Sequence, residues 1–177
     1  MIKKVAILGS GSWGTALGVV LADRGLDVML YGNREEQCEE INEQSTNSFY
    51  LPGIDLPENI SATTNIEDVV DCPLILLVVP SQVARTVLNQ LRDAGIPEDT
   101  IILTCNKGID PQSGKLMQAT VSELFPKNPV AVLAGPSHAE EVANRKATAA
   151  TIGSNDEEIS ARLQEIFTLP YFRTYTS

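Results

Sequence analysis

The chain has 177 residues, 43% of them hydrophobic and 20% charged, which is the composition of a soluble globular protein with one core. Its formal net charge of −10 argues against a nucleic-acid-binding protein and against one that coats an anionic membrane, because both need a contiguous basic surface. An anionic ligand would have to be held by local donors, such as backbone N–H groups at the start of a helix.

Strand-like and helix-like segments alternate along the chain, which is the pattern of an α/β protein. The predicted strands are residues 3–8, 27–31, 60–63, 74–79, 100–105, 130–134 and 146–152. The predicted helices are residues 12–24, 35–44, 81–94, 113–125, 137–144 and 156–168. The run LILLVV at residues 74–79 is typical of a central parallel strand. We expect a doubly wound, mostly parallel sheet with helices on both faces.

Two helix ends and one loop carry local signals. Gly25 is expected at the C′ position of the first helix, and Ser81 is expected to cap the helix that it begins. Residues 46–59 form a loop that contains Pro52 and Gly53. A loop of this length is uncommon in a compact domain unless it has a function.

The sequence GSGSWG at residues 9–14 matches G-x-G-x-x-G between a predicted strand and a predicted helix. In this context Gly9 permits the tight turn, Gly11 lets the backbone approach a pyrophosphate, and Gly14 allows close helix–strand packing. A glycine-rich turn without a ligand is the simpler alternative. The placement of the motif favours one Rossmann-type dinucleotide-binding domain over residues 1–177.

The end of the second predicted strand bears on the choice of dinucleotide. An acidic residue that binds the ribose hydroxyl is expected there, but the sequence has Asn33 and Arg34. Arg34 could bind a 2′-phosphate, so we expect NADP(H) to be preferred and NAD(H) to be possible. Glu35 and Glu36 weaken this expectation, and Arg34 could instead be an exposed residue at a helix start.

Two segments follow the carboxyl ends of predicted strands, where ligands bind in open parallel sheets. Lys107 could stabilise negative charge that develops on a reacting oxygen, although a solvated loop lysine explains it equally well. Ser137 and Glu140 fit a capping box, which leaves N–H donors free for a phosphate or hydroxyl. For His138 we favour a packing role over acid–base chemistry.

The three cysteines are far apart, no C-x-x-C occurs and there is one histidine, so we expect no metal site. The first residues lead directly into the glycine turn instead of a signal peptide, and no apolar run approaches membrane-spanning length. We expect a cytoplasmic, reduced setting and neither a membrane nor a nucleic-acid partner.

Six segments, in this order, resemble the bacterial-type NAD(P)-dependent glycerol-3-phosphate dehydrogenase family. They are GSGSWGTALG at residues 9–18, YLPGIDLPENI at 50–60, VVPSQ at 78–82, NKGI at 106–109, AGPSHAEEV at 134–142 and FRTYTS at 172–177. The resemblance implies that the dinucleotide is contacted by Ser12, Trp13, Asn33, Arg34, Tyr50 and Ala139. It also implies that Lys107 is catalytic and serves both cofactor and substrate, and that Gly135 and Ser137 line the substrate site.

The resemblance implies an oxidoreductase that interconverts dihydroxyacetone phosphate and sn-glycerol 3-phosphate and so supplies phospholipid synthesis. Family members continue past the equivalent of Ser177 into a helical second domain that provides the proton-transferring lysine. We therefore expect this chain to be the cofactor-binding part of the enzyme and to be inactive alone. A full-length form could be a homodimer. His138 stands where the family commonly has phenylalanine.

Two alternatives stay open. One is a related hydroxy-acid or ketopantoate-type reductase, which the combination of the NKG and AGPS segments disfavours. The other is a non-catalytic dinucleotide-binding or sensing module, which would not need Lys107 together with Ser137.

Overall fold

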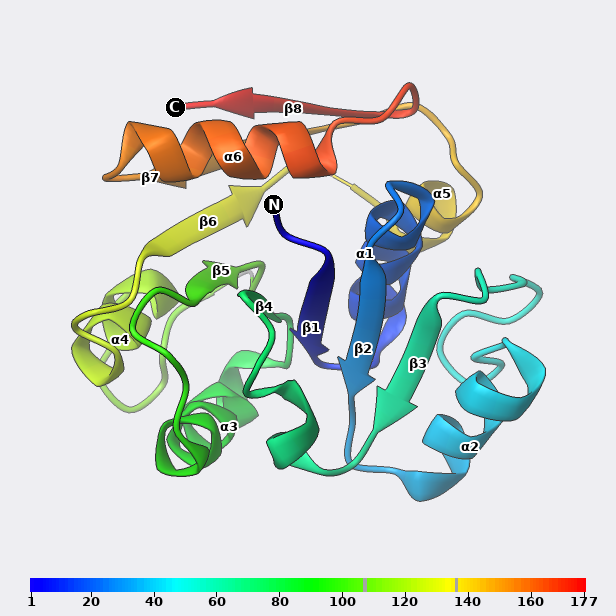
Figure 1. Ribbon diagram of the computed structural model, residues 1–177, viewed down its shortest axis with the longest axis horizontal. Helices are drawn as coiled ribbons and strands as arrows, with labels where there is room; N and C mark the ends of the chain where they lie inside the picture. Colours follow the sequence, from blue (N-terminus) through cyan, green and yellow to red (C-terminus); the bar gives the residue numbers. More distant parts are fainter. Residues whose placement is uncertain (107, 136) are drawn as a thin grey trace.

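The computed structural model describes residues 1–106, 108–135 and 137–177. In that part of the chain, eight strands form one sheet in the order β3-β2-β1-β4-β5-β6-β7-β8 (Figure 1). The strands are β1 (Lys4–Leu8), β2 (Asp27–Tyr31), β3 (Ile60–Thr63), β4 (Leu74–Leu77), β5 (Ile101–Thr104), β6 (Val130–Ala134), β7 (Thr148–Ser154) and β8 (Phe172–Thr176). The helices are α1 (Ser12–Asp23), α2 (Glu35–Gln44), the 3-10 helix η1 (Ile66–Val69), α3 (Ser81–Ala94), α4 (Met117–Leu124), α5 (Ala139–Ala143) and α6 (Glu157–Phe167).

The first strand lies in the middle of the sheet. It pairs in parallel with β2 on one side and with β4 on the other. β3 extends the first half, and β5 and β6 extend the second half, all in parallel. The direction of winding therefore reverses between β1 and β4, and ligands bind at the carboxyl ends of strands beside such a reversal. The predicted doubly wound sheet is confirmed.

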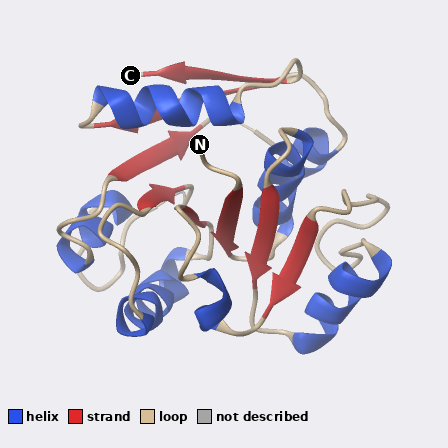
Figure 2. Cartoon of the chain, in the orientation of Figure 1, coloured by secondary structure: helices blue, strands red, loops and turns tan. Residues whose placement is uncertain are grey.

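Both faces of the sheet are covered because successive side chains of a strand point to opposite faces. In β1, Val5 and Ile7 belong to a core with apolar side chains of α1, α2, α5 and α6. Ala6 and Leu8 belong to a second core with side chains of α3 and α4. Helices therefore lie on both faces of the sheet (Figure 2). This burial on both faces explains the nearly continuous apolar strand sequences.

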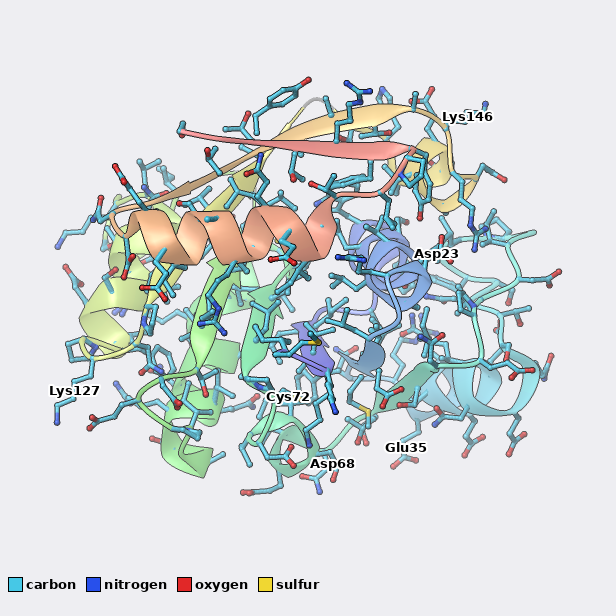
Figure 3. All side chains as sticks on the ribbon, turned by 45° about the horizontal axis from the view of Figure 1, so that its top comes forward. Asp23, Glu35, Asp68, Cys72, Lys127 and Lys146 are labelled. Atoms are coloured by element: carbon cyan, nitrogen blue, oxygen red, sulfur yellow. The ribbon has the colours of Figure 1, made fainter. Side chains whose placement is uncertain are left out.

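The sheet continues beyond β6 in a way that the sequence did not predict. β7 pairs antiparallel with β6, and β8, which was not predicted, pairs in parallel with β7. α6 and β8 lie at one end of the molecule, and α2 and β3 lie at the other (Figure 1). Asp23, at the end of α1 (Figure 3), accepts hydrogen bonds from Arg145 Nε at 2.8 Å and from Tyr171 Oη at 2.6 Å. These contacts tie α1 to the residues that flank β7 and β8.

Several predicted helix ends need correction. α4 begins at Met117 instead of residue 113, because the preceding residues form a turn in which Gly114 has φ +71°. The N-cap of α3 is Pro80, so the predicted cap by Ser81 is wrong. Gly25 has φ +98° directly after the C-cap Arg24, which confirms its predicted C′ position. None of the described helices is long and apolar enough to cross a membrane.

Candidate functional site

The glycine turn connects β1 to α1 at the point where the winding of the sheet reverses. Gly9 has φ +125°, and a Cβ there would lie 2.9 Å from the backbone of Val78 and of Val79. A Cβ on Gly14 would lie 1.9 Å from the carbonyl oxygen of Gly9. Both positions therefore exclude a side chain, because the turn packs directly against the β4 end and against its own helix.

Gly11 differs from the other two glycines of the motif. It has φ −75°, which any residue can adopt, and no atom lies within 4 Å of the position that its Cβ would occupy. The first intrahelical bond of α1 runs from the Thr15 N–H to the Gly11 carbonyl at 3.0 Å. The backbone N–H groups in the first turn of α1, before Thr15, have no intrahelical acceptor. This turn contains no acidic residue. This open, donor-rich side of the turn fits a diphosphate.

The carboxyl end of β2 packs onto the glycine turn. A Cβ on Gly32 would lie 2.2 Å from the Ser10 hydroxyl, so this position also excludes a side chain. The next residues, Asn33 and Arg34, are exposed, and Glu35 is exposed at the start of α2 (Figure 3). They lie where the ribose of a dinucleotide is bound in this type of fold.

The loop at residues 46–59 joins this end of the site. The Cζ atom of Arg34 lies 4.5 Å from the ring centroid of Phe49, a cation–π geometry. The Tyr50 ring meets the Phe49 ring edge-on, with centroids 4.9 Å apart. The Ser12 hydroxyl donates to the carbonyl oxygen of Tyr50 at 2.7 Å. The structure thus brings together Ser12, Arg34 and Tyr50, three predicted cofactor residues, and adds Phe49, which the sequence reasoning missed.

The carboxylate of Glu40, in α2, holds the start of the loop at residues 46–59. Glu40 accepts hydrogen bonds from the Ser48 backbone N–H at 2.6 Å, the Ser48 hydroxyl at 2.7 Å and the Thr46 hydroxyl at 2.8 Å. The hydrogen bonds from Ser48 lower the pKa of Glu40. An ionised Glu40 therefore fixes the segment that carries Phe49 and Tyr50.

A groove of about 280 Å³ lies on the other side of the turn. Its lining combines the start of α1, the ends of β4 and β5 and the start of α5. The lining residues are Trp13, Val78, Val79, Pro80, Ser81, Cys105, Asn106, Ser137 and Ala139. Three predicted site residues, Trp13, Ser137 and Ala139, therefore converge here. Lys107, the predicted catalytic residue, lies outside the described residues, although its neighbour Asn106 is in the lining.

Two buried polar atoms in this groove lack a hydrogen-bond partner among the described residues: the Asn106 Oδ1 and the Ser137 hydroxyl. The Asn106 Nδ2 donates to the Val79 carbonyl, which fixes the orientation of the amide. Buried polar groups are nearly always hydrogen-bonded. A carboxamide N–H has the chemistry to donate to the Asn106 Oδ1, so this part of the groove suits the nicotinamide end of a dinucleotide, and the Ser137 hydroxyl is left for a second polar group.

The segment after β6 departs from its predicted roles in two ways. α5 begins at Ala139, and its N-cap is His138 without a side-chain capping bond, so the predicted capping box at Ser137 is wrong. His138 is exposed instead of packed. A Cβ on Gly135 would lie 2.9 Å from the Ala149 carbonyl oxygen. Close packing against β7 therefore explains this glycine, and its substrate role stays a prediction.

The loop after β5 is anchored at its far end by a buried carboxylate. Asp110 is 1% exposed and pairs with the Arg85 guanidinium. It also accepts from the Ser113 hydroxyl at 2.7 Å and the Thr120 hydroxyl at 3.1 Å. The Arg85 hydrogen bond is the main cause that holds the pKa of Asp110 well below its usual range. Asp110 thus connects its part of the loop to α3 and α4.

Comparisons with known proteins agree with this geometry. The family model described as the NAD-dependent glycerol-3-phosphate dehydrogenase N-terminus matches residues 4–160. A "Glycerol-3-phosphate dehydrogenase [NAD(P)+]" of Bacillus cereus (strain G9842) is 43% identical over 180 residues, which cover 99% of this chain and 53% of that protein. This chain therefore spans about half the length of the curated relatives that it matches.

Solved structures give the same result. A crystal structure of glycerol-3-phosphate dehydrogenase from Coxiella burnetii superposes with a TM-score of 0.93 at 34% identity, over 99% of this chain and 54% of that one. The Plasmodium falciparum glycerol-3-phosphate dehydrogenase superposes with a TM-score of 0.92 at 29% identity, over 99% of this chain and 52% of that one. The chain belongs to the family of NAD-dependent glycerol-3-phosphate dehydrogenases and matches the N-terminal part of its members.

Proposed function

We propose that residues 1–177 bind the dinucleotide of an enzyme that interconverts dihydroxyacetone phosphate and sn-glycerol 3-phosphate with NAD(P)H. The observation that carries this proposal is the open side of Gly11 at the start of α1, next to a groove with two unpartnered polar atoms. The first feature suits a diphosphate, and in the groove the Asn106 Oδ1 suits a carboxamide while the Ser137 hydroxyl suits a polar substrate. Family membership favours this activity over the sensing module and over reductases with other substrates.

The residues of this chain have distinct roles in the proposal. The N–H groups at the start of α1 hold the diphosphate, with Gly9, Gly11 and Gly14 shaping the turn. Trp13, Asn106 and Ala139 surround the nicotinamide end, which supplies the hydride when the cofactor is bound. Lys107, Gly135 and Ser137 contact the substrate, and Lys107 stabilises the negative charge that develops on the carbonyl oxygen during reduction.

The oxygen that gains negative charge must also receive a proton. We propose that the donor is a lysine in the half of the relatives that residues 1–177 do not span, as the family resemblance implies. A positioned general acid typically contributes about 10²–10⁴ in rate. Residues 1–177 alone should therefore bind the dinucleotide without measurable turnover. We propose that the enzyme acts in the cytoplasm and supplies phospholipid synthesis. We also propose that its full-length form is a homodimer.

The preference for NADP(H) rests on the position of Arg34. Its guanidinium is exposed over the Phe49 ring at the ribose end of the site, where a 2′-phosphate would be placed. The carboxylates of Glu35 and Glu36 lie beside it in the first turn of α2 and oppose this preference. Because a guanidinium can form paired, charge-assisted hydrogen bonds with a phosphate, we propose that its attraction prevails.

The test is a titration with both reduced cofactors. Trp13 is the only tryptophan in the chain, and it lines the groove, so its emission should fall as a nicotinamide binds. We expect saturable binding of NADH and of NADPH, and we expect Arg34→Ala to weaken the binding of NADPH alone, roughly tenfold. Equal losses for both cofactors would contradict the role of Arg34. The absence of binding for both would overturn the proposed function.

A further inference from the structure

A buried cluster of hydrogen bonds lies directly beneath the glycine turn, and the motif itself does not account for it. The carbonyl oxygen of Ser10 accepts from Gln37 Nε2 at 2.6 Å, Asn47 Nδ2 at 3.0 Å and the Thr15 hydroxyl at 3.3 Å. Asn47 and Thr15 are 0% exposed, Ser10 is 6% exposed and Gln37 is 7% exposed. One backbone carbonyl thus receives donors from α1, from α2 and from the following loop.

The two amide side chains in this cluster are fully used. The second N–H of Asn47 donates to the Thr15 hydroxyl at 2.8 Å, and the second N–H of Gln37 donates to Asn47 Oδ1 at 3.1 Å. The Ser10 hydroxyl donates to Gln37 Oε1 at 3.1 Å. Each N–H of both amides therefore has an acceptor. A fully satisfied buried network is rigid, since any rotation would leave a polar atom unpaired.

Peptide geometry transmits this rigidity to the ligand side of the turn. The peptide between Ser10 and Gly11 is trans, as are all the described peptide bonds, so its C=O and its N–H point in opposite directions. Holding the Ser10 carbonyl toward the buried cluster directs the Gly11 N–H the other way. No atom lies within 4 Å of the position that a Cβ on Gly11 would occupy, so a ligand can approach the backbone at this residue.

We infer that Asn47 and Gln37 are positioning residues for the dinucleotide diphosphate, acting through the Ser10 carbonyl on the Gly11 N–H. The inference rests on the proposed dinucleotide binding and adds two residues outside the glycine motif. Preorganised donors bind an anion more tightly because no reorientation is needed when it arrives. Asn47 also connects the glycine turn to the loop that carries Tyr50. Its side chain donates to the Ser10 carbonyl, and its backbone carbonyl accepts from the Leu51 N–H at 2.8 Å.

The test measures the affinity for ADP-ribose, which contains the diphosphate but no nicotinamide, in Asn47→Ala. We expect the dissociation constant to rise about tenfold, because the Ser10 carbonyl loses one of the three hydrogen bonds that orient it. Asn59→Ala is the matched control, since Asn59 Nδ2 donates to the Ala22 and Leu26 carbonyls at 2.9 and 2.8 Å, away from the turn. The control should lose stability but keep its affinity for ADP-ribose.

A second readout separates positioning from general destabilisation. In the ¹H–¹⁵N spectrum the Gly11 resonance of the parent should shift on addition of ADP-ribose, and this shift should shrink in Asn47→Ala. If that variant does not fold, Gln37→Met keeps the side-chain volume, removes both donors and takes its place in both measurements. Parent-like affinity and parent-like Gly11 shifts in the variant would overturn the inference. Failure of the parent to bind ADP-ribose would instead overturn the proposed function.

Discussion

Two glycines of the same motif should respond in opposite ways to the same substitution. At Gly11 the backbone has φ −75° and ψ −168°, and the space for a Cβ is empty. Alanine at a compatible glycine position stabilises a protein by about 0.4–1 kcal/mol, because the unfolded chain loses conformational freedom. For a chain of this size, the melting temperature of Gly11→Ala should rise by roughly 1–4 °C.

At Gly14 the same substitution places a Cβ 1.9 Å from the Gly9 carbonyl oxygen, which is a backbone atom and cannot simply rotate away. Overpacking costs about 1–3 kcal/mol, and a contact this short belongs at the upper end. Replacing a helical glycine by alanine returns about 1 kcal/mol of helix propensity. The net expectation for Gly14→Ala is a loss of about 2 kcal/mol.

The variant that gains stability, Gly11→Ala, should lose affinity for the dinucleotide. The methyl group of Gly11→Ala projects into the space proposed for the diphosphate and keeps it from the N–H groups. Losing one hydrogen bond to a charged group, worth about 1.5–3 kcal/mol, corresponds to roughly a tenfold to hundredfold weaker affinity. Urea unfolding and the Trp13 titration measure the two effects. A stable Gly11→Ala that binds NADH as the parent does would refute the placement of the diphosphate.

Two further expectations concern groups with shifted pKa values. The ion pair with Arg85 lowers the pKa of Asp110, so its contribution to stability is complete above the ordinary carboxyl value of about 4 and is lost as the pH falls toward the lowered value. The difference in urea midpoint between the parent and Asp110→Asn should therefore narrow from pH 6 to pH 3; a constant difference would contradict this. Burial raises the pKa of the Cys72 thiol to about 11 and raises that of Cys105 as well. Iodoacetamide at pH 8 should label both only after addition of urea, and rapid labelling of the folded protein, read by mass spectrometry, would show that they are accessible.

The sequence predicted most elements because their apolar residues recur with the period of a strand or a helix. β8 was missed because Phe172 and Thr174 are its only buried residues, and the strand depends on pairing with β7. The start of α4 was misplaced because a buried carboxylate organises the preceding turn: Asp110 accepts from the Gln112 N–H at 3.2 Å and from the Ser113 hydroxyl. Such tertiary contacts leave no periodic signal.

The candidate site was predictable only in part for the same reason. The glycine turn has a local pattern, so its place between a strand and a helix could be found from spacing alone. Gln37 lies 27 residues and Asn47 lies 37 residues from Ser10, so their contacts with it exist only after the sheet has formed. Phe49 was missed because an exposed aromatic residue in a loop has no distinguishing context until the fold places the Arg34 guanidinium over its ring.

The stack of Arg34 on Phe49 has a practical consequence for protein engineering. Both side chains are exposed and belong to neither apolar core, and Phe49 is 68% exposed. Substitutions at such surface positions usually change stability by less than about 0.5 kcal/mol. A library randomised at these two positions can therefore be screened for altered coenzyme choice without the loss of folded protein that would accompany changes beneath the glycine turn.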